Sequence, residues 1–295
     1  MVRPYAVKWH KKQDKKRKLE GALASTHGEE EEEEEEELEE KEREVEEEVE
    51  KDEEDKEEDD EAAAAAADDV AGLPVVARPI GGSKKKKKGV IFVLERACLE
   101  VGKVGKNFQI LNSDDHSNYL RKQNCNPADY RPDIIHQALL AIFDSPLTKA
   151  GRLQAVYVRT EKGVLFEIKP YVRMPRTFKR FCGLMSQLLQ KLSITAVGKR
   201  DKLLNVIKNP VSRHLPIDSR KIGLSYSSEK SVNLVDYVAN ASDDTTLVFV
   251  VGAMAHGMID KDNMDDFISI CNYPLSAACC LNRICGALEQ KWNIK

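Results

Sequence analysis

TLVFVVGAMAHG, residues 246–257, is an apolar run of strand length that ends in a glycine-bearing loop. Two further stretches have the same form, LLNVIKNPVS (203–212) and FISICNYPLSAA (267–278), and each ends in a loop that contains proline. GVIFVLE (89–95) is a fourth apolar strand. Continuous apolar strands that alternate with helical patterns are typical of a largely parallel α/β sheet with helices on both faces, because both faces of such strands are buried.

The segments between these strands carry the helical and hairpin patterns that this fold class needs. RPDIIHQALLAIF (131–143) predicts a helix with its apolar residues on one face and Asp133 at the N-cap position. RLQAVYVRT (152–160) and GVLFEIKP (163–170) predict a hairpin. A final helix is predicted after residue 278, with Leu281 in its core stripe. We therefore expect one α/β domain over 89–295.

Ligands of parallel sheets bind outside the carboxyl ends of the strands. That rule places three loops around one candidate pocket: Asn209-Pro210, Gly252–Gly257 and Asn272–Leu275. The sequence contains neither the GxGxxG nor the GxxxxGK[ST] fingerprint, which argues against a dinucleotide site and a P-loop nucleotide site. The motifs GxSxG, HExxH and CxxC are also absent, which argues against a hydrolase site and a zinc site. We therefore expect no metal. Backbone loops of this kind suit a ligand such as S-adenosylmethionine.

YVRMPRTFKR (171–180) places three arginines near a predicted helix start: Arg173, Arg176 and Arg180. Pro175 suits the first turn of a helix, and the apolar pattern that follows predicts that Phe181, Leu188 and Leu192 are buried while the arginines face outward. No Asp or Glu lies between residues 168 and 200. The simpler interpretation is a solvated charged face; the functional one is a site for phosphate, which suits guanidinium groups.

The charge of the chain is divided between two regions of opposite sign. Residues 1–82 contain 13 Lys and Arg against 30 Asp and Glu, a net charge of -17, whereas residues 83–295 contain 33 against 20, a net charge of +13. The first region is of low complexity, and we expect 1–88 to be an acidic arm that is disordered or forms a transient charged helix. The basic domain favours nucleic acid as a partner. Basic clusters at Lys11–Lys18 and Lys84–Lys88 favour a nuclear, nucleolar protein, and no stretch is long and apolar enough for a membrane span.

Several segments over 89–295 closely resemble one family, in consecutive order. They are RPDIIHQALLAIFDSPL, RMPRTFKRFCGLMSQLLQKLS, LLNVIKNPVSRHLP, VFVVGAMAHG and ISICNYPLSA. The family is that of the eukaryotic ribosome-biogenesis methyltransferases that modify pseudouridine at ring nitrogen N1, in the SPOUT class. The resemblance implies a homodimer of α/β subunits, each with a C-terminal trefoil knot, that binds S-adenosyl-L-methionine and acts on small-subunit pre-rRNA together with ribosome assembly factors.

The resemblance also implies roles for individual residues. The residues implied to bind the cofactor are Leu224, Gly252, Gly257, Ile270, Cys271, Asn272, Tyr273, Pro274 and Leu275. Those implied to bind RNA are Arg131, Arg173, Arg176 and Arg180, with Asp133 orienting Arg131. Arg131 is our candidate for stabilising the anion that develops on the base, and we assign no general base.

Two other functions stay open at this point. The protein could be an assembly factor that binds pre-ribosomal RNA without catalysis, or the acidic arm could carry the main function by binding histones or other basic proteins. The sequence does not identify the target nucleotide or the role of the arm.

Overall fold

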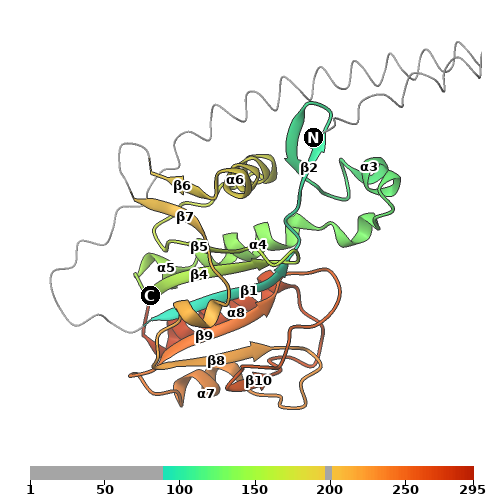
Figure 1. Ribbon diagram of the computed structural model, residues 1–295. Helices are drawn as coiled ribbons and strands as arrows, with labels where there is room; N and C mark the ends of the chain where they lie inside the picture. The colour runs from blue at the N-terminus through green and yellow to red at the C-terminus, as the bar shows by residue number, and fades with distance from the viewer. Residues whose placement is uncertain (1–88, 197–200) are drawn as a thin grey trace, which may run out of the picture. The chain divides into compact units, whose positions relative to one another are not determined.

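Eight strands form one sheet in the computed structural model, which describes residues 89–196 and 201–295 (Figure 1). The strands of this sheet are β1 (Val90–Ala97), β4 (Leu153–Thr160), β5 (Leu165–Ile168), β6 (Ser193–Thr195), β7 (Lys202–Ile207), β8 (Ser219–Leu224), β9 (Thr246–Gly252) and β10 (Asp266–Ile268). They lie in the order β10-β8-β9-β1-β4-β5-β7-β6. The acidic arm expected over 1–88 lies outside the described residues.

The remaining elements are a separate hairpin and the helices. The hairpin consists of β2 (Val101–Val104) and β3 (Asn107–Ile110). The helices are α3 (Ser117–Lys122), α4 (Pro132–Phe143), α5 (Pro146–Lys149), α6 (Phe178–Lys191), α7 (Leu234–Ala239), α8 (Ala277–Lys291) and the 3-10 helices η2 (Pro127–Asp129) and η3 (Val211–His214). The α4 helix and the β4–β5 hairpin confirm the predictions made from 131–143 and 152–170.

Strand β1 is an internal strand of the parallel part of the sheet. It pairs in parallel with β9 on one side and with β4 on the other. Phe92 and Leu94 pack into one hydrophobic core, which we call the first core, and Ile91 and Val93 pack into the second core on the opposite face. Burial on both faces is why this strand reads as a continuous apolar run rather than an alternating one.

The α-helices that cover the sheet lie on one face of it. Buried residues of α4, α5, α6, α7 and α8 all belong to the first core. The second core is covered by Val211 of η3 and by the β9–β10 connection, through Ile259 and Met264. Among the described residues, the α-helices therefore lie on one face of the sheet, and the 3-10 helix η3 lies on the other.

The direction of each crossover explains this one-sided arrangement. The β1-to-β4 and β8-to-β9 connections step the same way across the sheet, and the helices they contain, α4 and α7, reach the first core. The β9-to-β10 connection steps the opposite way. Because parallel crossovers are right-handed, this connection must pass over the other face, and it carries no helix.

Two strands differ from the sequence prediction. β7 pairs antiparallel with β5 and so belongs to the hairpin side of the sheet rather than to its parallel half. β8 was not predicted, because its first three residues are polar and only half-buried; Ile222 to Leu224 alone are buried. The connection between two antiparallel neighbours needs no crossover helix, which is why β4 is followed directly by β5 and β6 directly by β7.

The arginine helix begins later than its sequence pattern predicts. Helix α6 starts at Phe178, with Thr177 as N-cap, so Pro175 and Arg176 precede it. Phe181 and Leu188 are buried as predicted, but Leu192 is 57% exposed. Leu192 is the C-cap residue in the left-handed conformation, with φ of 62°, so the chain turns away before its side chain can reach the core.

Strand β10 is only three residues long, and a buried carboxylate stabilises its start. Asp266 accepts hydrogen bonds from Lys230 Nζ at 2.7 Å, from Arg220 at 3.1 Å and from the Tyr237 hydroxyl at 2.8 Å. These partners hold the pKa of Asp266 below its ordinary value, although burial alone would raise it. The group ties β10 to β8 and α7, which brings the loop after β10 to the carboxyl edge of the sheet.

None of the helices in the part of the chain that the structure describes could span a membrane. The same residues all fall within one compact unit.

Candidate functional site

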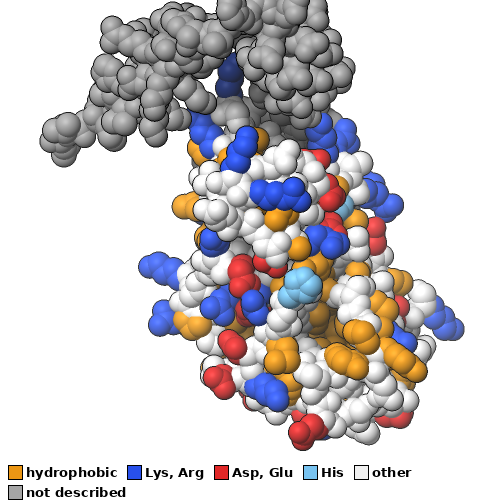
Figure 2. Space-filling model, turned by 90° about the vertical axis from the view of Figure 1, so that its right-hand side faces the viewer, with side chains coloured by type: hydrophobic (Ala, Val, Ile, Leu, Met, Phe, Trp, Pro, Cys, Tyr) orange, Lys and Arg blue, Asp and Glu red, His pale blue; other side chains and the backbone are white. Residues whose placement is uncertain are grey.

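The carboxyl ends of β1, β8, β9 and β10 meet at one edge of the sheet, which Figure 2 shows facing the viewer. Leu224 ends β8 and Gly252 ends β9. On this edge, hydrophobic side chains gather over the lower part of the described surface, and Lys and Arg side chains over the upper part (Figure 2). The edge therefore combines an apolar region with a cationic one.

Direct contacts join the loops that follow these strands. The Ser227 hydroxyl donates to Met258 Sδ at 3.2 Å, which joins the loop after β8 to the loop after β9. The loop after β8 is also bound to β10 and the residues that follow it: Ser228 Oγ donates to Phe267 O at 2.8 Å, and the Val232 N–H donates to Ser269 O at 2.9 Å. The loop after β8 is thus in contact with the loop after β9 and with β10.

Arg96, at the end of β1, is the residue that connects the most segments at this edge. Its guanidinium forms two hydrogen bonds of 2.9 Å with the Glu161 carboxylate, and its Nη1 donates to Met258 O at 3.2 Å. Its backbone is left-handed, with φ of 57°, a conformation that costs a non-glycine residue about 1–3 kcal/mol. The three hydrogen bonds hold the ends of β1 and β4 against the loop after β9 and offset this cost.

Sequence reasoning did not single out Arg96 or Glu161. One feature of the sequence could have identified Arg96. The charged residues Glu95 and Arg96 follow an apolar run of strand length, and polar residues at the carboxyl ends of parallel strands lie at the edge where ligands bind. Glu95 itself is mostly buried and lies 3.5 Å from Arg159. Burial raises the pKa of Glu95, and the positive charge of Arg159 partly offsets that rise.

Both predicted glycines lie where a side chain would meet this structure. A Cβ on Gly252 would lie 2.7 Å from Met254 Sδ. Gly257 has φ of 101°, and a Cβ there would lie 2.5 Å from the Arg96 guanidinium. Gly257 is required on two grounds, since L residues rarely adopt that backbone conformation and the Arg96 side chain fills the space.

The predicted run after β10 is divided between buried and exposed positions. Ile270 packs against the first core and lines a cavity of about 410 Å³ between the start of α7 and α8. The Cys271 carbonyl accepts a hydrogen bond from Ser269 Oγ at 2.9 Å. Asn272, Tyr273 and Pro274 are exposed, and Leu275 is half-buried.

Asn209 lies at the same edge but further along it. Its side chain donates to Gly163 O at 2.7 Å, in the β4–β5 turn that also carries Glu161. The Glu161–Arg96 pair therefore separates Asn209-Pro210 from the loop after β9, although all of them were predicted around one pocket.

Arg131 and Asp133 form a pair at the start of α4. Arg131 Nε and Nη2 donate to the two Asp133 carboxylate oxygens at 2.8 and 2.7 Å. The Arg131 hydrogen bonds hold the pKa of Asp133 below its ordinary value. The pairing confirms that Asp133 contacts Arg131, but the N-cap assignment is wrong: Arg131 is the N-cap residue, and Asp133 lies one residue inside the helix because Pro132 takes the first helical position.

The pair lies close to the carboxyl edge. Because α4 links two parallel strands, it runs antiparallel to them, so its first turn lies at that edge. The Cys98 thiol, directly after β1, hydrogen-bonds to the Arg131 backbone, and burial raises the pKa of that thiol to about 11.

The arginine segment lies along α4. His136 Nε2 contacts Pro175 O at 2.9 Å, and the His136 ring stacks on Phe181 with centroids 4.6 Å apart. Arg173, Arg176 and Arg180 are exposed, as predicted. The expectation that nearby carboxylates are absent is wrong for Arg176, which lies 3.3 Å from Asp144 at the C-cap of α4. The partner comes from another element, so inspection of 168–200 could not find it.

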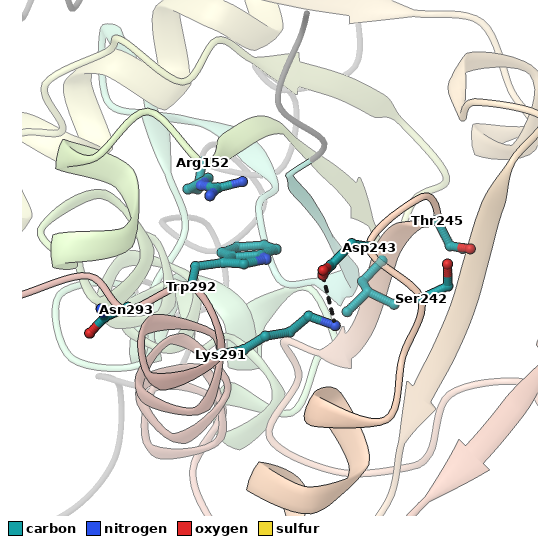
Figure 3. Close-up of a pocket in the computed structure, with 8 residues that line it drawn as sticks. Arg152, Ser242, Asp243, Thr245, Lys291, Trp292 and Asn293 are labelled. Atoms are coloured by element: carbon teal, nitrogen blue, oxygen red, sulfur yellow. Dashed lines mark ion pairs between the residues drawn. The ribbon is translucent and has the colours of Figure 1, made fainter.

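A separate cavity of about 380 Å³ lies at the opposite, amino edge of the sheet (Figure 3). Arg152, before β4, lies over the Trp292 ring at 4.8 Å from its centroid. Lys291 is almost buried; it donates to the backbone carbonyls of Val238 and Ala241 and lies 3.4 Å from Asp243. These contacts fasten the end of α8 to the end of α7, and none of the predicted site residues lines this cavity.

Comparison with known proteins gives one consistent result. The family model described as EMG1/NEP1 methyltransferase matches residues 92–289. The chain is 48% identical over 213 residues to the ribosomal RNA small subunit methyltransferase NEP1 of Drosophila melanogaster, covering 70% of this chain and 84% of that protein. It is 47% identical over 213 residues to the protein of the same name in Homo sapiens, covering 72% and 86%.

A solved structure has the same fold. Archaeoglobus fulgidus Nep1, determined bound to S-adenosylhomocysteine, aligns with a TM-score of 0.58 at 21% sequence identity, covering 70% of this chain and 99% of that one.

The Arg131–Asp133 pair predicts a pH-dependent stability. At about pH 7 we expect Asp133→Asn to lower the free energy of unfolding by about 0.2–1 kcal/mol, the range for exposed ion pairs. Because the folded-state pKa lies below the ordinary value of 3.8, this contribution is present above the unfolded pKa and is lost as the pH falls through the folded pKa. Urea unfolding from about pH 7 to about pH 3 measures the difference between variant and wild type.

Asp262→Asn is the matched control, since Asp262 is an exposed loop carboxylate without an ion-pair partner among the described residues. The control should follow wild type throughout. A difference for Asp133→Asn that persisted unchanged at about pH 3 would contradict the assignment.

Proposed function

The chain belongs to the EMG1/NEP1 methyltransferase family, and on that basis we propose that it transfers a methyl group from S-adenosyl-L-methionine to ring nitrogen N1 of a pseudouridine in small-subunit ribosomal RNA. The observation that carries the proposal is the family match over 92–289, which contains every loop of the carboxyl edge. Relatives named ribosomal RNA small subunit methyltransferase match over more than two thirds of the chain.

The residues at the carboxyl edge fit the cofactor. S-adenosyl-L-methionine supplies an electrophilic methyl group on a sulfonium, and its adenine suits main-chain hydrogen bonds and apolar side chains. The edge offers both: Leu224, Gly252 and Gly257 present backbone, and Tyr226, Met258 and Tyr273 are large exposed hydrophobic side chains on the same loops. We assign Ile270, Cys271, Asn272, Pro274 and Leu275 to the same site through the run that follows β10.

Arg131 and Asp133 are proposed to act on the base. Pseudouridine carries a proton on N1, which must leave as N1 forms its new bond to carbon, so negative charge develops on the ring. A guanidinium beside the ring stabilises that charge. Asp133 holds the Arg131 guanidinium by both of its oxygens, which fixes the plane of the fork. Asp133 is therefore a positioning residue in this proposal.

Arg173, Arg176 and Arg180 are proposed to bind RNA phosphates. They are exposed, and the contact between Pro175 and His136 lies one helical turn from Asp133 on the same face of α4. The ion pair of Arg176 with Asp144 is largely exposed and so costs little to break. The positive net charge of residues 83–295 supports a polyanionic partner.

The assembly and location of the protein are proposed from the same family. We propose a homodimer with a C-terminal trefoil knot in each subunit, acting with ribosome assembly factors in the nucleolus. The β9–β10 connection passes over the second core, whereas α8 packs against the first core. This change from one face of the sheet to the other supports the knot. The basic clusters at Lys11–Lys18 and Lys84–Lys88, which lie outside the described residues, support nuclear import.

Methyl transfer to matched RNA oligomers tests the function. One oligomer carries uridine and the other pseudouridine at a single position, and the incorporated methyl group is located by mass spectrometry of the nucleosides. We expect transfer to pseudouridine alone, because N1 of uridine is bonded to the sugar. Tight binding of both oligomers with no transfer to either would favour a non-catalytic assembly factor instead.

Gly257→Val predicts the loss of cofactor binding. The side chain would meet the Arg96 guanidinium and would require a backbone conformation that valine avoids. Titration calorimetry should detect at least a tenfold loss in affinity for S-adenosyl-L-methionine, equivalent to about 1.4 kcal/mol. Gly286→Ala is the control, because a Cβ at that helix position meets nothing within 4 Å. Wild-type affinity in a folded Gly257→Val protein would remove this residue from the site.

The arginine segment predicts a change in salt dependence. Replacing Arg176 and Arg180 with Gln should lower the slope of log affinity against log salt by roughly 1 to 1.5 units, since each phosphate contact on single-stranded RNA contributes about 0.7. Cofactor affinity should not change. Lys295→Gln is the control for the loss of one positive charge at a distant position, since Lys295 lies two residues after Asn293, which lines the cavity at the amino edge. An unchanged slope in the double variant would show that these arginines are only solvated.

A further inference from the structure

The β2–β3 hairpin has an anchored base and an exposed end. Val101 and Ile110 are opposite each other at the base, and both pack into the first core. Lys103 and Phe108 are the next opposite pair on the same face, since side chains two residues apart along a strand point the same way. Gly105 and Lys106 form the turn. The hairpin projects beyond the sheet beside α6 (Figure 1).

Phe108 is fixed by its backbone while its ring lies in solvent. The Ser186 hydroxyl on α6 donates to the Phe108 carbonyl oxygen at 3.0 Å, which holds β3 against the helix. The residue is nonetheless 55% exposed, and it belongs to neither hydrophobic core. Phe108 thus carries a partly exposed aromatic ring on a backbone that α6 holds in place.

The surroundings of this ring are cationic. Lys103, directly opposite it, and Lys106, two residues before it, are both exposed and have no carboxylate partner among the described residues. No Asp or Glu occurs from residue 101 to residue 113. On α6, Lys179 precedes Ser186 by seven residues and so lies on the same helix face, where it extends the positive charge toward the arginine segment.

We propose that Phe108 is a stacking platform for an unpaired base of the RNA strand outside the target position, with Lys103 and Lys106 contacting its phosphates. An exposed aromatic ring between unpaired lysines is the combination with which proteins bind single-stranded nucleic acid: the ring stacks on a base, and the cations follow the backbone. A protein partner would need a larger apolar area than one ring. The inference rests on the proposed function, because it takes single-stranded ribosomal RNA as the ligand.

RNA affinity of Phe108 variants tests the platform. The probe is a single-stranded RNA oligomer with one central pseudouridine. We expect Phe108→Ala to weaken binding about tenfold, equivalent to about 1.4 kcal/mol and within the range for one stacked base, while Phe108→Tyr binds as wild type. Ile217→Ala is the matched control, because Ile217 is a fully exposed hydrophobic residue just before β8, at the opposite edge of the sheet. Lys103→Gln with Lys106→Gln should lower the salt slope by roughly 1 to 1.4 units.

A second readout reports stacking itself. Phe108→Trp should show fluorescence quenching on addition of the oligomer, after subtraction of the wild-type signal from Trp9 and Trp292. Thermal unfolding of all variants should match wild type, because the ring packs against neither core. Wild-type affinity of Phe108→Ala together with unquenched Phe108→Trp would overturn the proposal. So would a change in oligomeric state with unchanged RNA affinity, which would make the ring a contact between two copies.

The two proposals can fail separately. If wild type does not methylate the oligomer but Phe108→Ala still weakens binding, the enzymatic function fails and the platform stands. If wild type methylates pseudouridine and the Phe108 variants bind like wild type, the platform alone is wrong.

Discussion

The parallel pairing of β1 with both of its neighbours is the constraint on which the rest of the structure depends. The register places Glu95 opposite Gly252 and Ala97 opposite Thr160, so the ends of three strands lie side by side. Parallel strands bring their following loops to one edge. Arg96 can therefore contact Glu161 and Met258 at once, although 65 and 162 residues separate them from it in the sequence. A register shift of one residue in β1 would break that junction and would move the side chains of each core to the opposite face of the sheet.

Polar groups, more than apolar packing, fasten the loops at this edge. Arg96 with Glu161 and Met258, and Asp266 with Lys230 and Tyr237, join segments that are distant in the sequence. Such contacts hold loops whose side chains stay accessible, whereas burying those side chains in a core would close the edge. The cavity at the amino edge has the opposite character: Lys291 is almost buried there and satisfies backbone carbonyls, which is a structural role.

Helix α4 connects the proposed cofactor site with the proposed RNA surface. Its first turn, with Arg131 and Asp133, lies at the carboxyl edge, and His136 one turn later contacts the segment that carries the three arginines. Helix α6 continues from that segment to Ser186, which holds the β2–β3 hairpin. Cationic side chains thus extend from the end of the sheet to the hairpin over rigid elements. In a chain with a net charge of -4, this concentration arises because the acidic residues gather before residue 83.

The sequence by itself determined the elements and the chemical class of the site. Strands 89–95 and 246–252, helix 131–143 and the hairpin after 152 follow from apolar periodicity, which is local, and the resemblance of consecutive segments identified the family that the comparison confirmed. Only the tertiary structure decided which faces the helices cover, that β7 is antiparallel, that Arg176 meets Asp144, and that Arg96 joins the β4–β5 turn to the loop after β9. Each of these depends on crossover direction or on partners distant in sequence, and neither leaves a periodic signal along the chain. Asp133 illustrates the difference between the two. Its residue type predicted a helix N-cap, but in the structure Pro132 occupies the first helical position and the Asp133 carboxylate pairs with the Arg131 guanidinium.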